Sequence, residues 1–189
     1  MTIDKYVVLD VEKANHQHDS ICQIGLVVIE KHKVVQEYLT YVNPKQDFLS
    51  IHTSIHGIVS TDVEYSPTME ELKPELLNIF SNAVVCSYGS SDKFAIGSFI
   101  DVSMIRWIDI YKMVRNSLPE LRESGFSLKK VCSSLGLGAQ SDLHNALEDA
   151  ILASRVLDHL IHTVKTDPNG YASLSPLNKS KPKKILRLL

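Results

Sequence analysis

The N-terminal quarter of the chain holds three strand-like segments joined by short polar links, and this pattern limits the possible folds more than any other. The segments are residues 6–12, 21–30 and 33–42, and the links read HQHDS and KHK. Val, Leu and Ile dominate the first two segments, whereas Val and Tyr alternate with polar residues in the third. Because links this short join antiparallel neighbours, we expect an antiparallel meander.

The rest of the chain alternates helical patterns with short apolar runs. Residues 69–80 place their apolar side chains near one face of a helix. The other expected elements are a strand at 83–87, a helix from about 92, a strand at 105–108 and helices at 109–116, 128–135 and 145–162. Strands followed by alternating helices and strands predict an α/β fold with a mixed sheet covered by helices.

Composition fits a soluble globular protein. Of the 189 residues, 44% are hydrophobic and 22% are charged. No apolar run of about 18 residues is present, and the first residues lack the pattern of a secretory signal, so we expect a cytoplasmic protein with no membrane contact. Three separated cysteines in apolar segments are expected to be reduced core residues: Cys22, Cys86 and Cys132.

Charge and composition change near the C-terminus. We expect one domain over residues 1–165 and a tail over 166–189 that is rich in Pro, Ser and Lys. The last eleven residues hold five basic side chains, so the remainder carries −7 against −2 for the whole chain. An acidic body repels phosphate unless metal ions lie between them. The basic tail either helps to hold nucleic acid or is a solvated chain end.

Two carboxylates follow the first apolar strand. Asp10 and Glu12 flank Val11, and residues two apart in a strand project to the same face. Burying paired carboxylates is costly, and a divalent cation removes that cost. Oxygen-only ligation favours Mg²⁺ or Mn²⁺. The alternative is a strand that has run out into solvent.

Two further groups of residues could carry chemistry. His144 and Asp149 lie where the last helix begins, and a helix N-terminus favours an anionic side chain. On a rigid helix, two residues five positions apart point in different directions. His144 is expected in the loop before the helix, so its side chain can still turn toward Asp149. Asp92 follows the short strand at 83–87, although taken alone a helix-capping aspartate explains it better.

The order of these groups resembles the histidine-bearing branch of the DEDD superfamily of 3′–5′ exonucleases, which includes the proofreading epsilon subunit of bacterial DNA polymerase III. The resemblance covers about residues 5–162. It extends to segments with no obvious metal role, which read VVLDVEKAN, SICQIGLVV, YVNP, SIHGI, RWIDI and HNALEDA.

The resemblance implies a ribonuclease-H-like fold and a set of site residues. The implied metal ligands for two Mg²⁺ or Mn²⁺ ions are Asp10, Glu12, Asp92 and Asp149, with His144 as general base and all five residues catalytic. The implied substrate contacts are Val11, Lys13, Ile55 and His56. The implied reaction is hydrolysis of phosphodiester bonds from the 3′ end of single-stranded DNA, which releases nucleoside 5′-monophosphates, with a polymerase as a possible partner.

The chain departs from the family pattern near two of these positions. Lys13 stands where the family usually has Thr, and Ser91 stands where a Phe usually precedes the third Asp. Tyr88 replaces a common His, and the segment after Asp92 is short, which weakens the assignment of Asp92. Asp109 matches a family Asp that begins a helix, and we expect it to cap that helix.

Three functions remain open from the sequence. The first is the DNA exonuclease. The second is an exoribonuclease, because the 2′-hydroxyl contact that separates RNA from DNA cannot be read from these residues. The third is a nucleic-acid-binding module on a decayed nuclease fold, against which the presence of all four acids and the histidine argues. Tyr88 and Trp107 could stack on bases, but an aromatic in an apolar run such as Trp107 is more often core.

Overall fold

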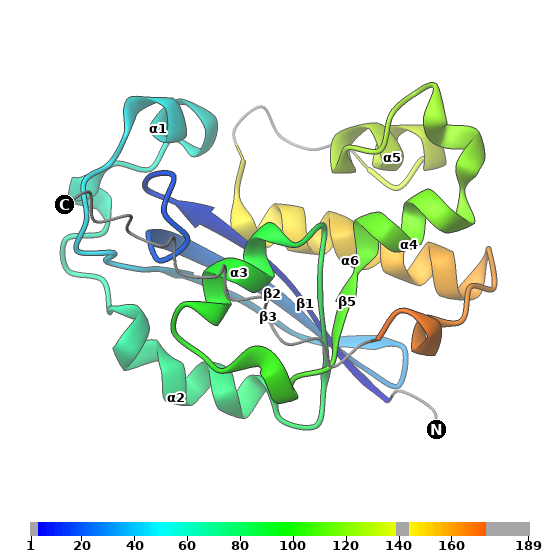
Figure 1. Cartoon of the computed structure of the whole chain (residues 1–189), viewed down its shortest axis with the longest axis horizontal. Helices are drawn as coiled ribbons and strands as arrows, with labels where there is room; N and C mark the ends of the chain where they lie inside the picture. The colour runs from blue at the N-terminus through cyan, green and yellow to red at the C-terminus, as the bar shows by residue number, and fades with distance from the viewer. Residues whose placement is uncertain (1–3, 139–143, 173–189) are drawn as a thin grey trace, which may run out of the picture.

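A computed structural model describes residues 4–138 and 144–172, which form a five-stranded sheet with helices on both faces (Figure 1). The strands are β1 (Lys5–Lys13), β2 (Ile21–Glu30), β3 (Lys33–Tyr41), β4 (Val84–Ser87) and β5 (Trp107–Asp109). The α-helices are α1 (Ser50–His56), α2 (Met69–Phe80), α3 (Ser91–Gly97), α4 (Ile110–Ser117), α5 (Leu128–Leu135) and α6 (Ala146–His162). Short 3-10 helices cover Ser60–Asp62, Val102–Met104, Pro119–Arg122 and Pro168–Gly170.

The strand order is β3-β2-β1-β4-β5. The first three strands pair antiparallel, and β4 and β5 add in parallel. The predicted meander and mixed α/β sheet are therefore confirmed. The expected elements all occur, with ends that move by one or two residues. The helix α1 was not predicted.

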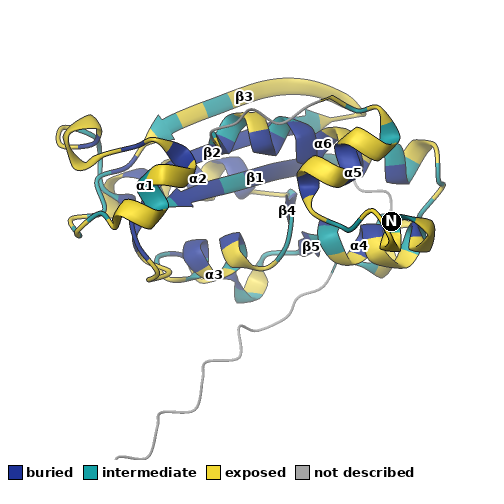
Figure 2. Cartoon of the chain, turned by 90° about the horizontal axis from the view of Figure 1, so that it is seen from above, coloured by how far each residue is buried: buried dark blue, intermediate teal, exposed yellow. Residues whose placement is uncertain are grey.

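Two apolar cores lie on the two faces of the sheet. Successive side chains of β1 point to opposite faces and enter different cores. Val7 and Leu9 pack with α2 and α3, whereas Tyr6 and Val8 pack with α4, α5 and α6. Figure 2 shows β1 and β2 buried between these layers and β3 exposed along the edge. The central strand is thus held rigidly on both faces up to its last residues.

Several expectations for single residues are confirmed. The three cysteines are free and buried. Trp107 is core, and its indole N–H donates to Ser87 Oγ at 2.9 Å. Asp109 caps α4, because its Oδ1 accepts from the backbone N–H of Lys112 at 3.1 Å. None of the described helices is long and apolar enough to cross a membrane. Most of the expected tail, from residue 173 onward, lies outside the described residues.

Candidate active site

Asp10 and Glu12 project together from the C-terminal half of β1. Their partners in β2 are Gly25 and Gln23, respectively. The parallel strand β4 pairs with β1 only from Tyr6 to Val8. The edge of β1 beyond that point is therefore open to a side chain that follows β4.

Asp92 occupies that open edge. It lies in the first turn of α3, directly after β4, and its side chain is 6% exposed. Burial raises the pKa of Asp92 to about 7. Two backbone hydrogen bonds, from its own N–H and from that of Val11, act in the opposite direction, as does the positive charge of Lys13. The departures at Ser91 and Tyr88 do not remove this placement. Ser91 begins α3, and the Tyr88 hydroxyl donates to the carbonyl of Phe126 at 2.8 Å.

Asp149 reaches the same place from the start of α6. The side chain of Asn145 caps this helix by accepting from the backbone N–H groups of Leu147 and Glu148. The backbone N–H of Ala146 donates to Gln23 Oε1 at 2.9 Å, which ties the helix start to β2. Asp149 is 4% exposed and therefore enters the site from a fixed helix end.

Gly25 makes this close approach of α6 possible. A Cβ atom at Gly25 would overlap the backbone of Ala146 and Leu147. From the sequence we placed Gly25 only within a strand and gave Gln23 no role. An isolated Gly inside a strand is a known signal of close backbone approach, so this residue could have been found from sequence.

His144 lies just before the cap of α6 and turns toward the acids. Its Nδ1 is 3.5 Å from Asp149 Oδ2, and its side chain is 46% exposed. Its backbone N–H donates to the carbonyl of Ile55 at 3.0 Å, which links it to α1. The histidine is thus held beside the acids while its ring remains accessible to solvent.

The charges of the four acids converge. Burial raises the pKa of Asp10 well above its usual range, and the charges of Asp92, Glu12 and Asp149 raise it further. Burial and the charges of Asp149 and Asp92 raise the pKa of Glu12 to about 8. The positive charge of Lys13 lowers this pKa and so limits the rise. Among the described residues, Glu12, His144 and Asp149 each offer one ligand atom, and these three atoms lie within 4.8 Å of one another.

This donor set fits a divalent cation. Buried carboxylates that repel one another cost free energy, and a hard cation with oxygen ligands removes the cost. Asp10, Glu12, Asp92 and Asp149 gather at the end of β1 as expected, and His144 stands with them. Their individual catalytic roles stay predictions.

The four expected substrate contacts surround this cluster in different ways. The side chain of Val11 is buried in the core, so only its backbone faces the site. Lys13 is half-buried beside the acids. Ile55 is 43% exposed, whereas His56 is 6% exposed. Substrate binding by these residues stays a prediction.

His56 is fully engaged by the backbone. Its Nδ1 accepts from the N–H of Ile58 at 3.0 Å, so its Nε2 donates to the carbonyl of Lys13 at 3.1 Å. Burial lowers its pKa, which favours this neutral form. His56 therefore joins α1 to the end of β1.

Replacing His56 with alanine is expected to lower the free energy of unfolding by about 1–3 kcal/mol, because it leaves two buried backbone groups unpaired. Replacing the exposed Ile55 with alanine should leave stability within about 0.5 kcal/mol and raise the KM for an oligonucleotide. Urea denaturation and steady-state kinetics measure both effects. An unchanged stability of His56→Ala with a raised KM would instead assign His56 to substrate binding.

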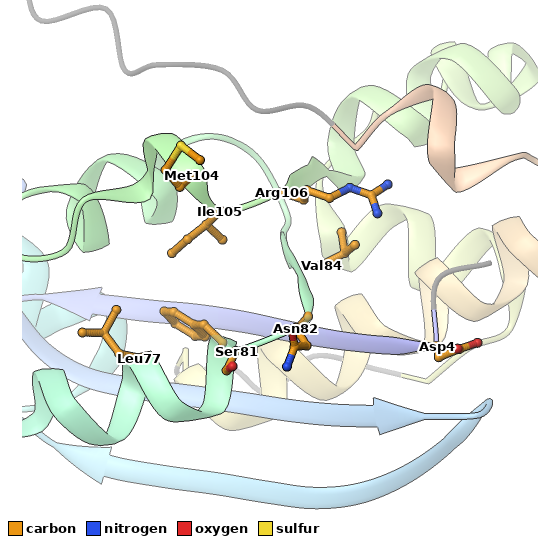
Figure 3. Close-up of a pocket in the computed structure, with 10 residues that line it drawn as sticks. Asp4, Leu77, Ser81, Asn82, Val84, Met104, Ile105 and Arg106 are labelled. Atoms are coloured by element: carbon orange, nitrogen blue, oxygen red, sulfur yellow. The ribbon is translucent and has the colours of Figure 1, made fainter. Parts of the chain in front are cut away.

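A hollow at the opposite end of the sheet offers a contrast with this cluster (Figure 3). Its wall includes the apolar side chains of Leu77, Met104 and Ile105, with Asp4 and Arg106 as its charged residues. One carboxylate and one arginine in the wall do not provide the ligands that a catalytic cation requires. The acids at the C-terminal end of β1 are therefore the better candidate for a cation site.

Comparison with known proteins gives a consistent result. A family model described as an exonuclease matches residues 7–157. The chain is 31% identical over 186 residues to a DNA polymerase III PolC-type protein of Caldanaerobacter subterraneus subsp. tengcongensis, which covers 92% of this chain and 13% of that protein. It is 23% identical over 197 residues to DNA polymerase III subunit epsilon of Aquifex aeolicus, with 93% of this chain and 91% of that protein covered.

Solved structures share the fold. Exonuclease X, in complex with 5′ overhanging duplex DNA, superposes with a TM-score of 0.74 at 20% identity over 89% of this chain and 98% of that one. A 3′-exonuclease that recognises a histone mRNA stem-loop superposes with a TM-score of 0.71 at 15% identity over 86% of this chain and 84% of that one. The chain spans about 13% of the length of the PolC-type relatives.

Proposed function

Because the chain belongs to the exonuclease family whose model spans residues 7–157, we propose that it removes nucleotides from the 3′ end of single-stranded DNA with the help of two divalent cations. The observation that carries this proposal is the convergence of Asp10, Glu12, Asp92 and Asp149 at the end of β1. Stepwise hydrolysis would release nucleoside 5′-monophosphates.

The four carboxylates would hold the cations, with Asp10 as the candidate to contact both. When bound, two divalent cations make a water nucleophilic near neutral pH and neutralise charge on the phosphate and the leaving oxygen. Asp149, which lies 3.5 Å from His144 Nδ1, orients the imidazole. His144 accepts the proton of the attacking water at Nε2, the ring nitrogen that does not face Asp149.

The groups around the cluster would position the strand. Ile55 is exposed and directly joined through its carbonyl to the backbone of His144, so an apolar contact with the last base would lie beside the general base. Lys13 places an ammonium near Glu12 and Asp92, where a substrate phosphate would also lie.

RNA is the second candidate substrate, since the solved structures with this fold include one that recognises an mRNA stem-loop and one in complex with DNA. Digestion of matched single-stranded DNA and RNA, labelled at the 5′ end, in Mn²⁺ tests both candidates. A ladder of products shortened one nucleotide at a time from the 3′ end supports the proposal. Cleavage at internal positions only, or none in either substrate, would overturn it.

Replacing His144 with alanine is expected to lower kcat at about pH 7.5 by about 10²–10⁴-fold, the usual contribution of a general base. Initial rates at saturating Mn²⁺ and about pH 7.5 measure the loss. Near-normal rates of the variant at neutral pH would show that another group removes the proton.

A further inference from the structure

A second hollow opens at the carboxyl ends of β4 and β5, beside the acid cluster. It has a volume of about 300 Å³, and its wall includes Gly89 and Ser90 together with the side chains of Lys93, Asp109 and Lys112. Lys93 directly follows Asp92 in α3, and the charge of Asp109 raises the pKa of Asp92. The hollow therefore lies next to the proposed catalytic residues, on the side of Asp92 away from β1.

Two lysines give this hollow a positive charge. Lys93 Nζ lies 5.8 Å from the centre of the Trp107 ring. Lys112, in the first turn of α4, lines the same hollow.

Asp109 lines the same hollow and pairs with Lys112. Its Oδ1 is used in capping α4, and its Oδ2 is 3.8 Å from Lys112 Nζ. The side chain of Lys112 is 72% exposed, and an exposed ion pair contributes little free energy. The ammonium of Lys112 can therefore turn to another anion at small cost.

We propose that this lysine pair, Lys93 and Lys112, binds a backbone phosphate of the substrate strand on the 5′ side of the bond that is cleaved. The proposal rests on the function proposed above, because the hollow adjoins Asp92, one of the acids beside which the 3′ end would be held. Sequence-independent phosphate contacts of this kind give affinity and orientation without reading the bases. The lysines are positioning residues and take no part in the chemical step.

The test compares Lys112→Gln, Lys93→Gln and the double variant with Lys33→Gln, an exposed lysine at the start of β3. Fluorescence anisotropy of a labelled single-stranded oligomer of about twelve nucleotides gives the Kd at several salt concentrations. Removing one ammonium group should weaken binding several-fold and reduce the slope of log K against log salt by about 0.7. Lys33→Gln should match the wild type.

Kinetics separate this proposal from the proposed function. In an active protein, Lys112→Gln should raise the KM for the oligomer several-fold, with a much smaller change for the p-nitrophenyl ester of thymidine 5′-monophosphate, which has no upstream phosphate. Equal effects on both substrates, or salt slopes identical to that of the wild type, would overturn the lysine-pair proposal. If the wild type cleaves neither substrate, the proposed function fails, and the anisotropy series still decides whether the lysines bind the strand.

Discussion

Replacing Asp10 with asparagine is expected to lower kcat by at least about 10³-fold, because Asp10 is one of the four acids proposed to hold the cations and the charges of the other three act on it. A loss of this size corresponds to about 4 kcal/mol of transition-state stabilisation. Initial rates at saturating Mn²⁺ measure the loss. The matched control is Glu37→Gln, an exposed acid on β3, which should keep the wild-type rate.

The same substitution should stabilise the metal-free protein at high pH. The pKa of Asp10 is raised in the folded state, so its contribution to stability is complete below its unfolded value of about 4 and is lost as the pH rises through the folded value. Glu12 and Asp92, with pKa values raised to about 8 and about 7, act in the same direction. The metal-free wild type should therefore lose stability between about pH 5 and 8, and Asp10→Asn should lose less.

Urea denaturation in the presence of a chelator, at about pH 5 and about pH 8, tests the predicted loss of stability at the higher pH. Added Mn²⁺ should restore the stability of the wild type at the higher pH and have little effect on Asp10→Asn, since ligand binding to the folded state stabilises it by mass action. A metal-free wild type that becomes more stable toward pH 8 would show that the acids are not buried together.

Replacing Gly25 with alanine should disable the site without removing any of its chemical groups. The added methyl group would overlap the backbone of Ala146 and Leu147, so the start of α6 would have to move away from β2. Asp149 and His144 would move with it. A displacement of about 1 Å at an active site can lower the rate about 10²-fold, so we expect a loss of at least that size.

Stability should fall as well, by about 1–3 kcal/mol, the cost typical of forcing extra atoms into a packed site. Gly170→Ala provides the matched stability control, because an added Cβ there meets no atom within 4 Å, and its unfolding free energy should stay within about 0.5 kcal/mol. Thermal unfolding and initial rates measure both effects. A Gly25→Ala protein with normal rate and stability would contradict the close packing of α6 on β2.

Most of the fold could be predicted because periodicity reports it directly. The strands β1 and β2 are apolar runs, and α6 has a clear apolar stripe. The helix α1 was missed for a physical reason. Only His56 is buried among its seven residues, and Leu49 provides no side-chain cap. Contacts from Lys13 and His144, distant in sequence, hold this helix, and no local pattern indicates them.

The acids of the site could also be predicted, because each stands at the end of a recognisable element. The residues that place them could not be predicted as easily. Gln23 bonds to Ala146 across 123 positions of sequence, and the open edge of β1 depends on where β4 stops pairing. Such relations arise only when the strands pair in register, so the sequence indicates the four acids more readily than the residues that hold them in place.

A Mn²⁺ titration followed by calorimetry tests the central claim most directly, since the claim is that four acids converge to hold divalent cations. We expect saturable binding of two ions to the wild type and to Glu37→Gln, and strongly weakened binding to Asp10→Asn and Asp149→Asn. Absence of saturable binding by the wild type, or equal binding by all four proteins, would contradict the account.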